Sequence, residues 1–509
     1  MCTPDLAILT KPDANKILRN LWPQSEYDFT LLIVQIRQEN YMKTYKLVRD
    51  ILVENTYDVL VAGGGPAGSA AAVCAARLGA KVLLIEATGC LGGMGTSGLV
   101  TAFDPMADGE RMLVGGFMRE VVETMYKRGF LGPQVYPDFW RKEYHRWTPF
   151  KPDGLKMLLD ELSKDSGVEV RFFTQVIDAD AAPEKVNGVI LHNIEGYRYV
   201  SAKTFIDATG DAILADLCGV RCREAGRDTS RIMPASLCSL YAGIDWPRVR
   251  AEEDRLPINW GTTKKVHLEP LKRAIADGHF TQPDRFLPGM FQIGKTLGNL
   301  NGGHIFNLNA LRCKDLTDGM MLGRKIAMEY TEFYRKYVPG FENIEHVTTS
   351  ALMGLRESRR IVGEYELKLD DYMVRRQFPD QIGVYNKTID IHPYDCSEEE
   401  YERFEKEFLR DGRLGQGECV GIPYGIIVPK GWTNLWVPGR SCSADVKVHG
   451  SIRVQPSAAM MGQAAGTSAV QSFRTGQPAC DLDTAELVNT LRKAGAYLPQ
   501  KGLSREMTR

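Results

Sequence analysis

The chain lacks the cysteine spacings that define several other classes of protein. It has 11 cysteines among 509 residues, yet no two of them form a Cys-x-x-Cys pair. The closest two are Cys218 and Cys222. This pattern excludes the usual zinc and iron–sulfur spacings and a redox-active Cys-x-x-Cys disulfide. We therefore expect most cysteines to be small buried residues in a reducing compartment.

Long apolar runs and an excess of one charge are also missing. No run approaches the roughly 20 residues that span a bilayer, and the N-terminal segment lacks a signal-peptide pattern. A formal net charge of -1 offers no electrostatic footprint for nucleic acid or an anionic membrane. No His/Glu/Cys cluster has metal-ligand spacing. We expect a cytoplasmic protein that acts on a small molecule, holds no metal and binds neither nucleic acid nor membrane; its oligomeric state is left open.

One stretch, Tyr57 to Glu86, carries a clear pattern. An apolar strand breaks at three glycines, a helix of small residues follows from Pro66, and a second strand ends on Glu86. This is a βαβ unit with the spacing G-x-G-x-x-G at Gly63, Gly65 and Gly68. It predicts a site for a dinucleotide.

Each residue of this motif has a physical reason. Gly63 permits the tight turn, Gly65 lets the backbone approach a pyrophosphate, and Gly68 lets the helix pack on the sheet. The helix N-terminus presents free N–H groups to the phosphates. Glu86 stands 18 residues past Gly68, where its carboxylate can hold ribose hydroxyls. A glycine-rich turn in an ordinary parallel sheet is the alternative, and it leaves Glu86 unexplained.

Further glycine-containing segments are expected to contact the same ligand. A loop rich in glycine, from Gly92 to Gly98, follows the strand that ends on Glu86, and two later strands end in Asp207–Asp211 and Pro438–Arg440. The chain resembles the FAD-dependent oxidoreductases of the glutathione-reductase-type superfamily, and within these the flavoprotein part of heterodisulfide reductase. The matching stretches are GGGPAGSAAA, LGGMGTSG, FIDATGDA, GLRESRRIVGEY, NLWVPGR and SIRVQPSAAMMGQAAGTSA.

The resemblance implies FAD as cofactor and assigns residues to it. The expected contacts to the pyrophosphate, ribose, adenine, ribityl chain and flavin ring come from Gly63, Gly65, Pro66, Ala67, Gly68, Glu86, Gly92, Gly93, Met94, Val176, Thr209, Gly210, Asp211, Gly439, Arg440, Gly462, Gln463 and Ala464. The helix that carries the last three would direct its N-terminal region at the flavin, where its dipole stabilises negative charge.

The resemblance also implies the fold and its parts. We expect an α/β protein with a discontinuous Rossmann-like FAD/NAD(P)-binding domain of the three-layer ββα type and an inserted mixed α+β substrate domain. The expected parts are an N-terminal extension at 1–54, interpreted as a mis-assigned start before Met42 or a loosely held segment, the FAD-binding domain at 55–225, a substrate or cap domain at 226–430, the C-terminal part of the FAD-binding domain at 431–475, and a polar tail at 476–509 with one helix.

NAD is the main rival ligand for the first motif. A simple NAD dehydrogenase has no use for the segments around Asp207–Asp211 and Gly439–Arg440, and no second G-x-G-x-x-G follows a strand. Electrons would therefore reach the flavin from the substrate, from briefly docked NAD(P)H or from a redox partner protein. The cluster-binding cysteine runs of heterodisulfide reductase are missing, so clusters and disulfide reduction are not carried over.

Two constellations are candidates for the chemistry. His449 and Arg453 lie between the Gly439–Arg440 turn and the last small-residue helix, where His449 could act as acid or base and Arg453 could hold an anion. They could equally be a helix cap and a structural ion pair. Arg356 and Arg360 would share a face at i and i+4 of a helix and suit a carboxylate or phosphate. A structural network with Glu357 and Glu364 is the alternative.

Two histidines lie in loop-like stretches of the expected substrate domain. His304 and His392 are candidates to line the pocket, with a surface or hydrogen-bonded loop histidine as the alternative. We conclude that this is an enzyme that transfers a hydride between flavin N5 and a small polar organic substrate, with oxidation of a hydroxyl- or amine-bearing carbon favoured. The alternatives are an electron-transfer flavoprotein that works with a partner redox protein, and a non-catalytic nucleotide-binding scaffold.

Overall fold

A computed structural model describes residues 45–54, 56–136, 147–254, 264–408 and 413–499. The chain forms two units, Met1–Ile51 and Leu52–Arg509. In the first unit only residues 45–51 are described, and 45–50 are exposed coil. The prediction for residues 1–41 therefore lies outside the described residues. Everything below concerns the second unit.

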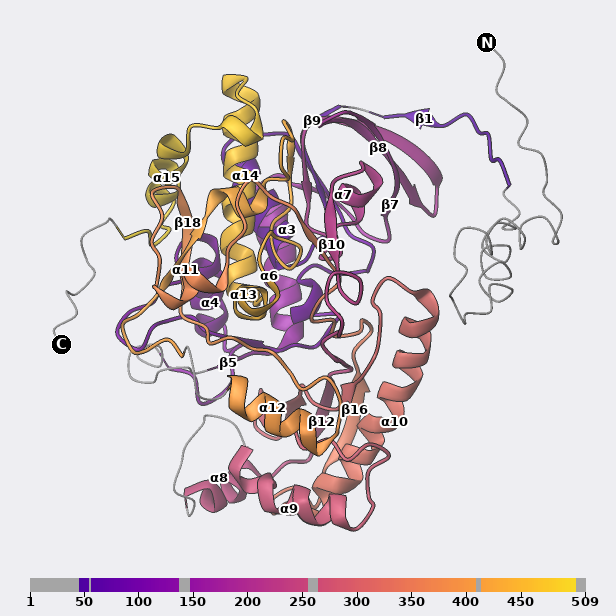
Figure 1. Ribbon diagram of the computed structural model, residues 1–509, viewed down its shortest axis with the longest axis vertical. Helices are drawn as coiled ribbons and strands as arrows, with labels where there is room; N and C mark the ends of the chain where they lie inside the picture. The colour runs from indigo at the N-terminus through magenta and orange to yellow at the C-terminus, as the bar shows by residue number, and fades with distance from the viewer. Residues whose placement is uncertain (1–44, 55, 137–146, 255–263, 409–412, 500–509) are drawn as a thin grey trace, which may run out of the picture. The chain divides into compact units, whose positions relative to one another are not determined.

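A parallel sheet carries the G-x-G-x-x-G motif. Its strands, in spatial order, are β6 (Glu169–Arg171), β3 (Val82–Ile85), β2 (Tyr57–Ala62) and β9 (Gly196–Asp207), and β20 (Leu435–Trp436) also pairs with β9. The first part of β9 leaves this sheet to pair antiparallel with β8 (Lys185–Asn193), which pairs with β7 (Gln175–Ala182). One long strand thus belongs to both the parallel sheet and the meander (Figure 1).

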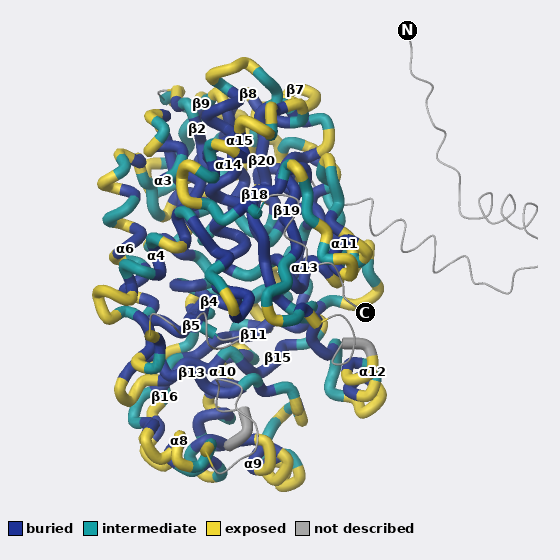
Figure 2. Tube along the Cα trace, turned by 90° about the vertical axis from the view of Figure 1, so that its left-hand side faces the viewer, coloured by how far each residue is buried: buried dark blue, intermediate teal, exposed yellow. Residues whose placement is uncertain are grey.

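The central strands β2 and β3 are buried on both faces, except for the half-buried Asp58, as expected when a sheet is covered on each side, whereas the edge strand β6 is partly exposed. Alternate residues separate cleanly: Val59 and Val61 join the core beneath the helices, whereas Leu60 and Ala62 join the core with the meander. The helix-side core includes α3 (Pro66–Arg77), α4 (Gly116–Lys127), α6 (Pro152–Asp165), α14 (Gln455–Thr475) and α15 (Thr484–Lys493). Figure 2 shows the buried interior around these elements. This is the three-layer ββα arrangement that the sequence predicts.

Close backbone contacts lock α3 between the glycine turn and α14. A Cβ on Gly68 would lie 1.8 Å from the Gly63 carbonyl oxygen, so the helix and the turn touch through backbone atoms. A Cβ on Gly462 of α14 would lie 2.0 Å from the Ala67 oxygen. Glycine at these positions therefore lets the two helices and the turn approach closely, and α3 and α14 run side by side in Figure 1.

A second, smaller core lies around an antiparallel sheet. Its strand order is β13 (Met290–Gln292), β14 (Gly298–Leu300), β12 (Ser239–Ala242) and β16 (Glu345–Thr349). The helices α8 (Trp246–Asp254), α9 (Lys264–Ala276) and α10 (Cys313–Tyr337) supply apolar side chains such as Val249, Leu271 and Phe333 to the same core. A core of mixed strands and helices thus lies where the sequence predicts an inserted domain, and its role in binding substrate stays a prediction.

Shorter elements connect these cores. They are β1 (Leu52–Val53), η1 (Gly93–Gly95), β4 (Ala102–Phe103), β5 (Thr148–Pro149), α7 (Ile213–Leu217), β10 (Cys222–Glu224), β11 (Ala235–Ser236), β15 (His304–Ile305), β17 (Arg359–Ile361), α11 (Leu369–Met373), β18 (Gln381–Tyr385), α12 (Glu398–Phe408), β19 (Val420–Pro423), η2 (Tyr424–Ile427), α13 (Val446–Ile452) and η3 (Ala479–Asp481). In the described part of the chain, no helix is long and apolar enough to cross a membrane.

One local prediction differs from the structure. The predicted helix carrying Arg356 and Arg360 does not form; β17 (Arg359–Ile361) instead pairs with β10, and Gly354 bridges to Ser236. Strand partners from distant parts of the chain override the local helical pattern there.

Core membership also differs from the expected cap boundaries. The second core draws on residues from Ala235 to Met353. Buried residues from Leu367 to Val428, expected in the cap, belong to the first core with the parallel sheet and α14. Helix α15, in the expected polar tail, buries Leu487 and Leu491 in that same core.

Candidate functional site

The turn between β2 and α3 has the shape that a phosphate cradle needs. Gly63 has a φ of 95°, and a Cβ there would lie 2.6 Å from the Ala208 oxygen. At Gly65 a Cβ would meet no atom within 4 Å, so the backbone faces open space. Helix α3 begins with Pro66 and has no side-chain cap and no acid in its first turn. An uncapped helix N-terminus beside an open backbone surface fits a bound pyrophosphate.

Glu86 lies directly beside this turn. Its Oε2 accepts a hydrogen bond of 2.7 Å from the Gly64 N–H, and its Oε1 accepts one of 2.8 Å from each of the Thr88 N–H and Oγ1. The carboxylate is buried and so fixes the turn. The predicted ribose contact of Glu86 stays a prediction.

The glycine-rich loop lies between two helix N-termini. A Cβ on Gly93 would lie 2.9 Å from the Gly65 Cα, and one on Gly95 would lie 2.4 Å from Oε1 of Gln455, the first residue of α14. Helix α14 has no side-chain cap or first-turn acid either. Met94 is half-buried in the same loop, and Gly92 has a positive φ of 98°. The loop therefore brings the start of α3 and the start of α14 together.

The two later glycine-punctuated segments meet through Arg440. Its Nε donates to the Gly210 oxygen at 2.7 Å, and its guanidinium forms a 2.6 Å ion pair with Asp211. Thr209 donates its hydroxyl to Asp207, and Gly439, with a φ of 88°, lies so that a Cβ would be 3.3 Å from the Ala67 Cβ. All three predicted segments thus converge on the start of α3.

Other predicted cofactor residues have packing roles. Gly462 packs on α3, Gln463 accepts the Phe117 N–H at the start of α4 with a 3.0 Å bond, and Ala464 is fully buried. The first turn of α14, from Gln455, is the part that lies at the convergence. Val176 is half-buried in β7, and nothing in its surroundings tests its predicted adenine contact.

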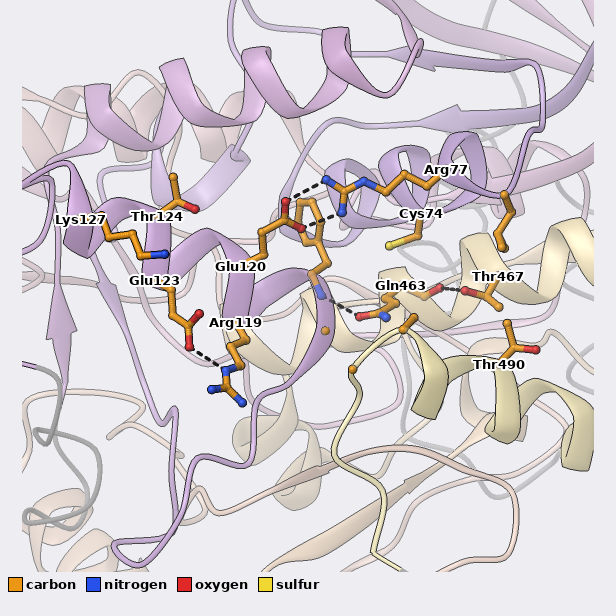
Figure 3. A pocket seen from close by; sticks show the side chains of 15 residues that line it. Cys74, Arg77, Arg119, Glu120, Glu123, Thr124, Lys127, Gln463, Thr467 and Thr490 are labelled. Carbon is orange, nitrogen blue, oxygen red and sulfur yellow. Dashed lines mark hydrogen bonds and ion pairs between the residues drawn. The ribbon is translucent and has the colours of Figure 1, made fainter.

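A cavity of about 480 Å³ lies elsewhere, along the far end of α3 (Figure 3). Its lining includes Cys74 and Arg77 of α3, Glu120 of α4 and Gln463 of α14. Arg77 already forms a 2.7 Å ion pair with Glu120 there. Because Cys74 lies nine residues, or about 13 Å of helix, beyond Gly65, this cavity is not the cradle.

A chain of titratable groups, three of them buried and the fourth, Asp390, partly exposed, lies in the loops between the two cores. His304 of β15 and His392 approach with a 2.8 Å contact between Nε2 and Nδ1. Asp284 Oδ2 lies 3.2 Å from the other nitrogen of His304, and Asp390 Oδ1 lies 3.3 Å from the other nitrogen of His392. The chain therefore runs carboxylate, imidazole, imidazole, carboxylate.

The electrostatics of this chain favour ionised carboxylates. Burial opposes the charge of Asp390, yet Lys387 and His392 hold its pKa well below its usual value. Burial likewise opposes the charge of Asp284, but His304 lowers its pKa. Burial and the nearby Arg356 cation hold the pKa of His392 well below 6.5. His392 is therefore a neutral imidazole at neutral pH in this arrangement.

A buried lysine extends the network towards the glycine-rich loop. Lys387 contacts Asp104 through an ion pair and lies 3.9 Å from Asp390 Oδ2. Burial opposes its charge, but these two carboxylates raise the pKa of Lys387 above its ordinary value. Its ammonium also lies 5.2 Å from the centre of the Trp147 ring.

Arg356 and Arg453 enclose the other side of the histidine pair. Arg453, which caps the C-terminus of α13, donates to two backbone carbonyl oxygens. These are the Asp390 oxygen at 2.9 Å and the Arg356 oxygen at 3.0 Å. The predicted Arg360–Glu357 network is present as a buried pair 3.6 Å apart, whereas Glu364 accepts the Gly431 N–H instead. Arg453 thus reaches the backbone of Asp390, whose side chain contacts His392, and it also bonds to the Arg356 backbone.

The fourth predicted catalytic residue, His449, is fully buried in α13. Its Nε2 lies 2.7 Å from the Arg440 carbonyl oxygen and must therefore carry the proton. Its Nδ1 has no hydrogen-bond partner among the described residues. Burial, followed by the Arg360 cation, holds the pKa of His449 well below 6.5. A neutral histidine bonded to the turn supports Gly439–Arg440, and its predicted role as acid or base stays a prediction.

Sequence reasoning missed Asp284, Lys387 and Asp104, which come from distant loops. Asp390 could have been found, because it stands two residues before His392, and i,i+2 side chains of an extended segment share one side. Within the described ranges, no group of three His, Cys, Asp or Glu side chains is placed to hold a metal ion.

Comparison with known proteins adds the identity of the family. A model of the family described as FAD dependent oxidoreductase matches residues 58–491. Solved structures with a similar fold include a geranylgeranyl bacteriochlorophyll reductase-like protein from Thermoplasma acidophilum (14% identity, 87% of this chain and 85% of that chain, TM-score 0.43) and the flavin-dependent brominase Bmp2 (15%, 86% and 83%, 0.42). A third is p-nitrophenol 4-monooxygenase from Pseudomonas putida (9%, 86% and 82%, 0.37).

The cradle, the converging glycine segments and the matched range define a flavoenzyme. The chain belongs to the FAD-dependent oxidoreductase family. Its cofactor is FAD, as the resemblance in the sequence implies. FAD therefore replaces NAD, the rival candidate, as the ligand of the G-x-G-x-x-G motif.

Proposed function

We propose that this enzyme transfers a hydride between a small polar organic substrate and the N5 position of its FAD, at the junction of the two cores. The observation that carries the proposal is the chain Asp284–His304–His392–Asp390. Oxidation of a carbon that bears a hydroxyl or an amine fits best, because such a reaction must also dispose of one proton. Reduction of a double bond is the reverse use of the same groups.

The residues of the cradle support the cofactor assignment. The open backbone at Gly65, the uncapped starts of α3 and α14, and the Gly93 contact with Gly65 fit a long, doubly charged ligand. We propose that Gly63–Gly68 holds the pyrophosphate and that Glu86 holds the ribose. When bound, FAD supplies the two-electron chemistry.

The histidine pair can hold or release one proton. Both outer nitrogens face carboxylates, so each fits an N–H, and the 2.8 Å contact between the inner nitrogens needs one more proton. All these contacts are satisfied when the four ring nitrogens carry three protons, one on each outer nitrogen and one between the inner two. Two neutral imidazoles carry only two protons, so the pair can accept one more. In the oxidation direction the substrate's O–H or N–H proton would enter through Asp390, the exposed end of the chain, which passes it to the neutral pair, and the hydride would leave the neighbouring C–H bond of the same substrate for the flavin.

Aromatic packing keeps this proton from bulk water. Phe286 stacks on His304 with ring centres 5.1 Å apart and lies 4.5 Å from His392, and Phe306 covers His304 edge-on. Tyr401 donates to the other oxygen of Asp284 at 2.8 Å. These contacts fix the ring orientations, which is what a positioned acid–base group requires.

The route by which electrons enter or leave the flavin is also part of the proposal. The flavin would be reoxidised or reduced through docked NAD(P)H or a redox partner protein. Kinship with the flavoprotein part of heterodisulfide reductase is proposed on the sequence resemblance. A cytoplasmic location is proposed on the scattered cysteines, which are typical of a reducing compartment.

The test uses the purified holoprotein under anaerobic conditions. Hydroxy and amino compounds are screened for bleaching of the oxidised-flavin band, in parallel with NADH and NADPH. For a substrate that bleaches it, His392→Gln should slow bleaching by about 100-fold or more and remove the ascending limb of its pH profile. His279→Gln is the matched control, because the His279 ring bonds to the Glu329 backbone oxygen in the second core, away from the histidine pair.

Either of two results would overturn the proposal. One is an unchanged rate and pH profile in His392→Gln. The other is bleaching that occurs only when a second protein is added, which would favour the electron-transfer alternative.

A further inference from the structure

We infer that the substrate carries a carboxylate, bound between the guanidinium groups of Arg356 and Arg453 beside the histidine pair. This inference deepens the proposed function and rests on its placement of the active site. The contacts of the two arginines carry it.

Arg356 reaches only neutral acceptors. Its Nη1 donates to the Pro234 backbone oxygen, and both Nη atoms lie 3.1 Å from the Ser236 hydroxyl. Among the described residues it has no carboxylate partner within ion-pair distance. A guanidinium has five N–H donors, so these contacts leave part of its bonding capacity for a ligand.

Arg453 shows the same pattern. It donates to the Arg356 and Asp390 backbone oxygens and lies 3.3 Å from the Met233 sulfur. Across the described part of the chain, no carboxylate forms an ion pair with it either. Two like charges therefore share one interior region, with only neutral groups bound to them.

Neighbouring arginines show how this protein normally satisfies a buried guanidinium. Arg440 pairs with Asp211 at 2.6 Å, Arg359 with Asp216 at 2.8 Å and Arg360 with Glu357 at 3.6 Å. Each of these has an acidic partner from the chain itself. Within the described ranges, Arg356 and Arg453 differ in that the chain supplies them with none.

The cost of this arrangement points to a missing anion. Burial lowers the pKa of Arg356 to about 10, and the Arg453 cation contributes to the same lowering. Burial also lowers the pKa of Arg453, and the Asp390 carboxylate acts against the lowering at both arginines without forming an ion pair with either. A buried charge is expensive unless an opposite charge accompanies it. An anion between the two guanidiniums would remove both the repulsion and the unpaired charge.

Accessibility and position favour a ligand over a structural ion. Arg356 and Arg453 are only half-buried, and 33% of the Asp390 side chain stays exposed, whereas Glu357 and His304 are buried. The exposed part of Asp390 therefore puts this side of the cluster in contact with solvent. The planar fork of a guanidinium matches a carboxylate in a bidentate geometry. A carboxylate held there would place its neighbouring carbon beside His392.

The experiment measures anion binding to the holoprotein without turnover. Acetate is the probe, since the smallest alkyl carboxylate must fit any site built for a larger one, and acetamide is the uncharged control. We expect acetate to perturb the visible flavin spectrum saturably with a millimolar dissociation constant and acetamide to leave it unchanged. No saturable response below about 100 mM acetate, or an equal response to acetamide, would overturn the inference.

Variants locate the binding site. Arg356→Met and Arg453→Met should each weaken acetate binding at least tenfold, because each removes a charge-assisted bond. Arg356→Lys keeps the charge and should lose less, which preserves the test if a methionine variant retains no FAD. Arg223→Met is the matched control, since Arg223 pairs with Glu366 outside the site.

The alternative is that the two arginines bind the flavin, not a substrate carboxylate. In that case both methionine variants would lower the flavin midpoint potential while acetate affinity stays unchanged, and the inference fails. The proposed function fails separately, through an unaltered pH profile in His392→Gln, so the two failures can be told apart.

Discussion

The cradle and the junction, two regions of one fold, are built by opposite means. Around Gly63–Gly68 the chain removes side chains, so that backbone atoms pack on one another and leave open space at Gly65. Around His304 and Arg356 the chain gathers charged side chains into an interior with few carboxylate partners for its cations. The first region depends on backbone shape and the second on the balance of buried charges, so substitutions in the two regions should have different consequences.

The largest loss of stability is expected at Gly68, because this residue both shapes the glycine turn and packs α3 against it. In Gly68→Ala the new methyl would lie 1.8 Å from the Gly63 oxygen, a distance that no rotamer change relieves. Helix propensity favours alanine over glycine by only about 1 kcal/mol, so the clash dominates. We expect a loss of several kcal/mol in stability and little FAD-bound protein, measured by thermal unfolding and the visible absorption of the purified protein. Normal FAD content and an unchanged melting temperature would contradict this close packing.

The next largest effect should come from breaking the charge pair at the junction. Asp104→Asn leaves the Lys387 ammonium buried with only the more distant Asp390 as its carboxylate partner among the described residues. Removing one partner of a buried pair typically costs about 3–5 kcal/mol. The double variant Asp104→Leu with Lys387→Met removes both charges and should recover most of that loss, measured by denaturant unfolding. Equal destabilisation of the single and double variants would show that packing, not charge, dominates there.

At Gly65, the effect of a substitution on FAD binding can be measured separately from its effect on stability. In Gly65→Ala the added methyl meets no protein atom within 4 Å, and φ is already -66°. Apoprotein stability should therefore stay within about 0.5 kcal/mol of the wild type. The methyl would occupy the space next to the expected pyrophosphate, so FAD affinity should fall about tenfold or more, measured by fluorescence titration of the apoprotein. If affinity is unchanged, the pyrophosphate does not lie against Gly65.

The same contrast explains how much of the molecule can be predicted from its sequence. The glycine spacing, Glu86 and the converging segments can be found because a backbone site leaves a local signature of fixed spacing. The pairing of His304 with His392 cannot, since 88 residues separate them and the loops that bring them together have no periodic pattern. The helix expected at Arg356 does not form because pairing of β17 with β10 decides that segment.

Position along the chain is a weaker guide than a motif of fixed spacing. His449 and Gln463 are candidates for chemistry and cofactor binding by their position beside flavin-facing segments. Their side chains instead bond to backbone groups, His449 to the Arg440 oxygen and Gln463 to the Phe117 N–H. Such bonds form only in the folded backbone, so no local pattern in the sequence predicts them.

The smallest effect concerns His449, where the two regions meet at the Arg440 turn. The folded-state pKa of His449 lies below its ordinary value of 6.5, so the unfolded chain binds the extra proton more readily. Its contribution to stability is therefore full above pH 6.5 and falls as the pH drops below it, by about 1.4 kcal/mol per pH unit for one proton. His392 adds a second proton of the same sign. His449→Gln should flatten the decline of stability between pH 6.5 and 5 relative to its own value at pH 8, measured by urea unfolding. Parallel curves for variant and wild type would mean that His449 is accessible to protons in the folded protein, and that the turn is not sealed from the acid–base chemistry of the junction.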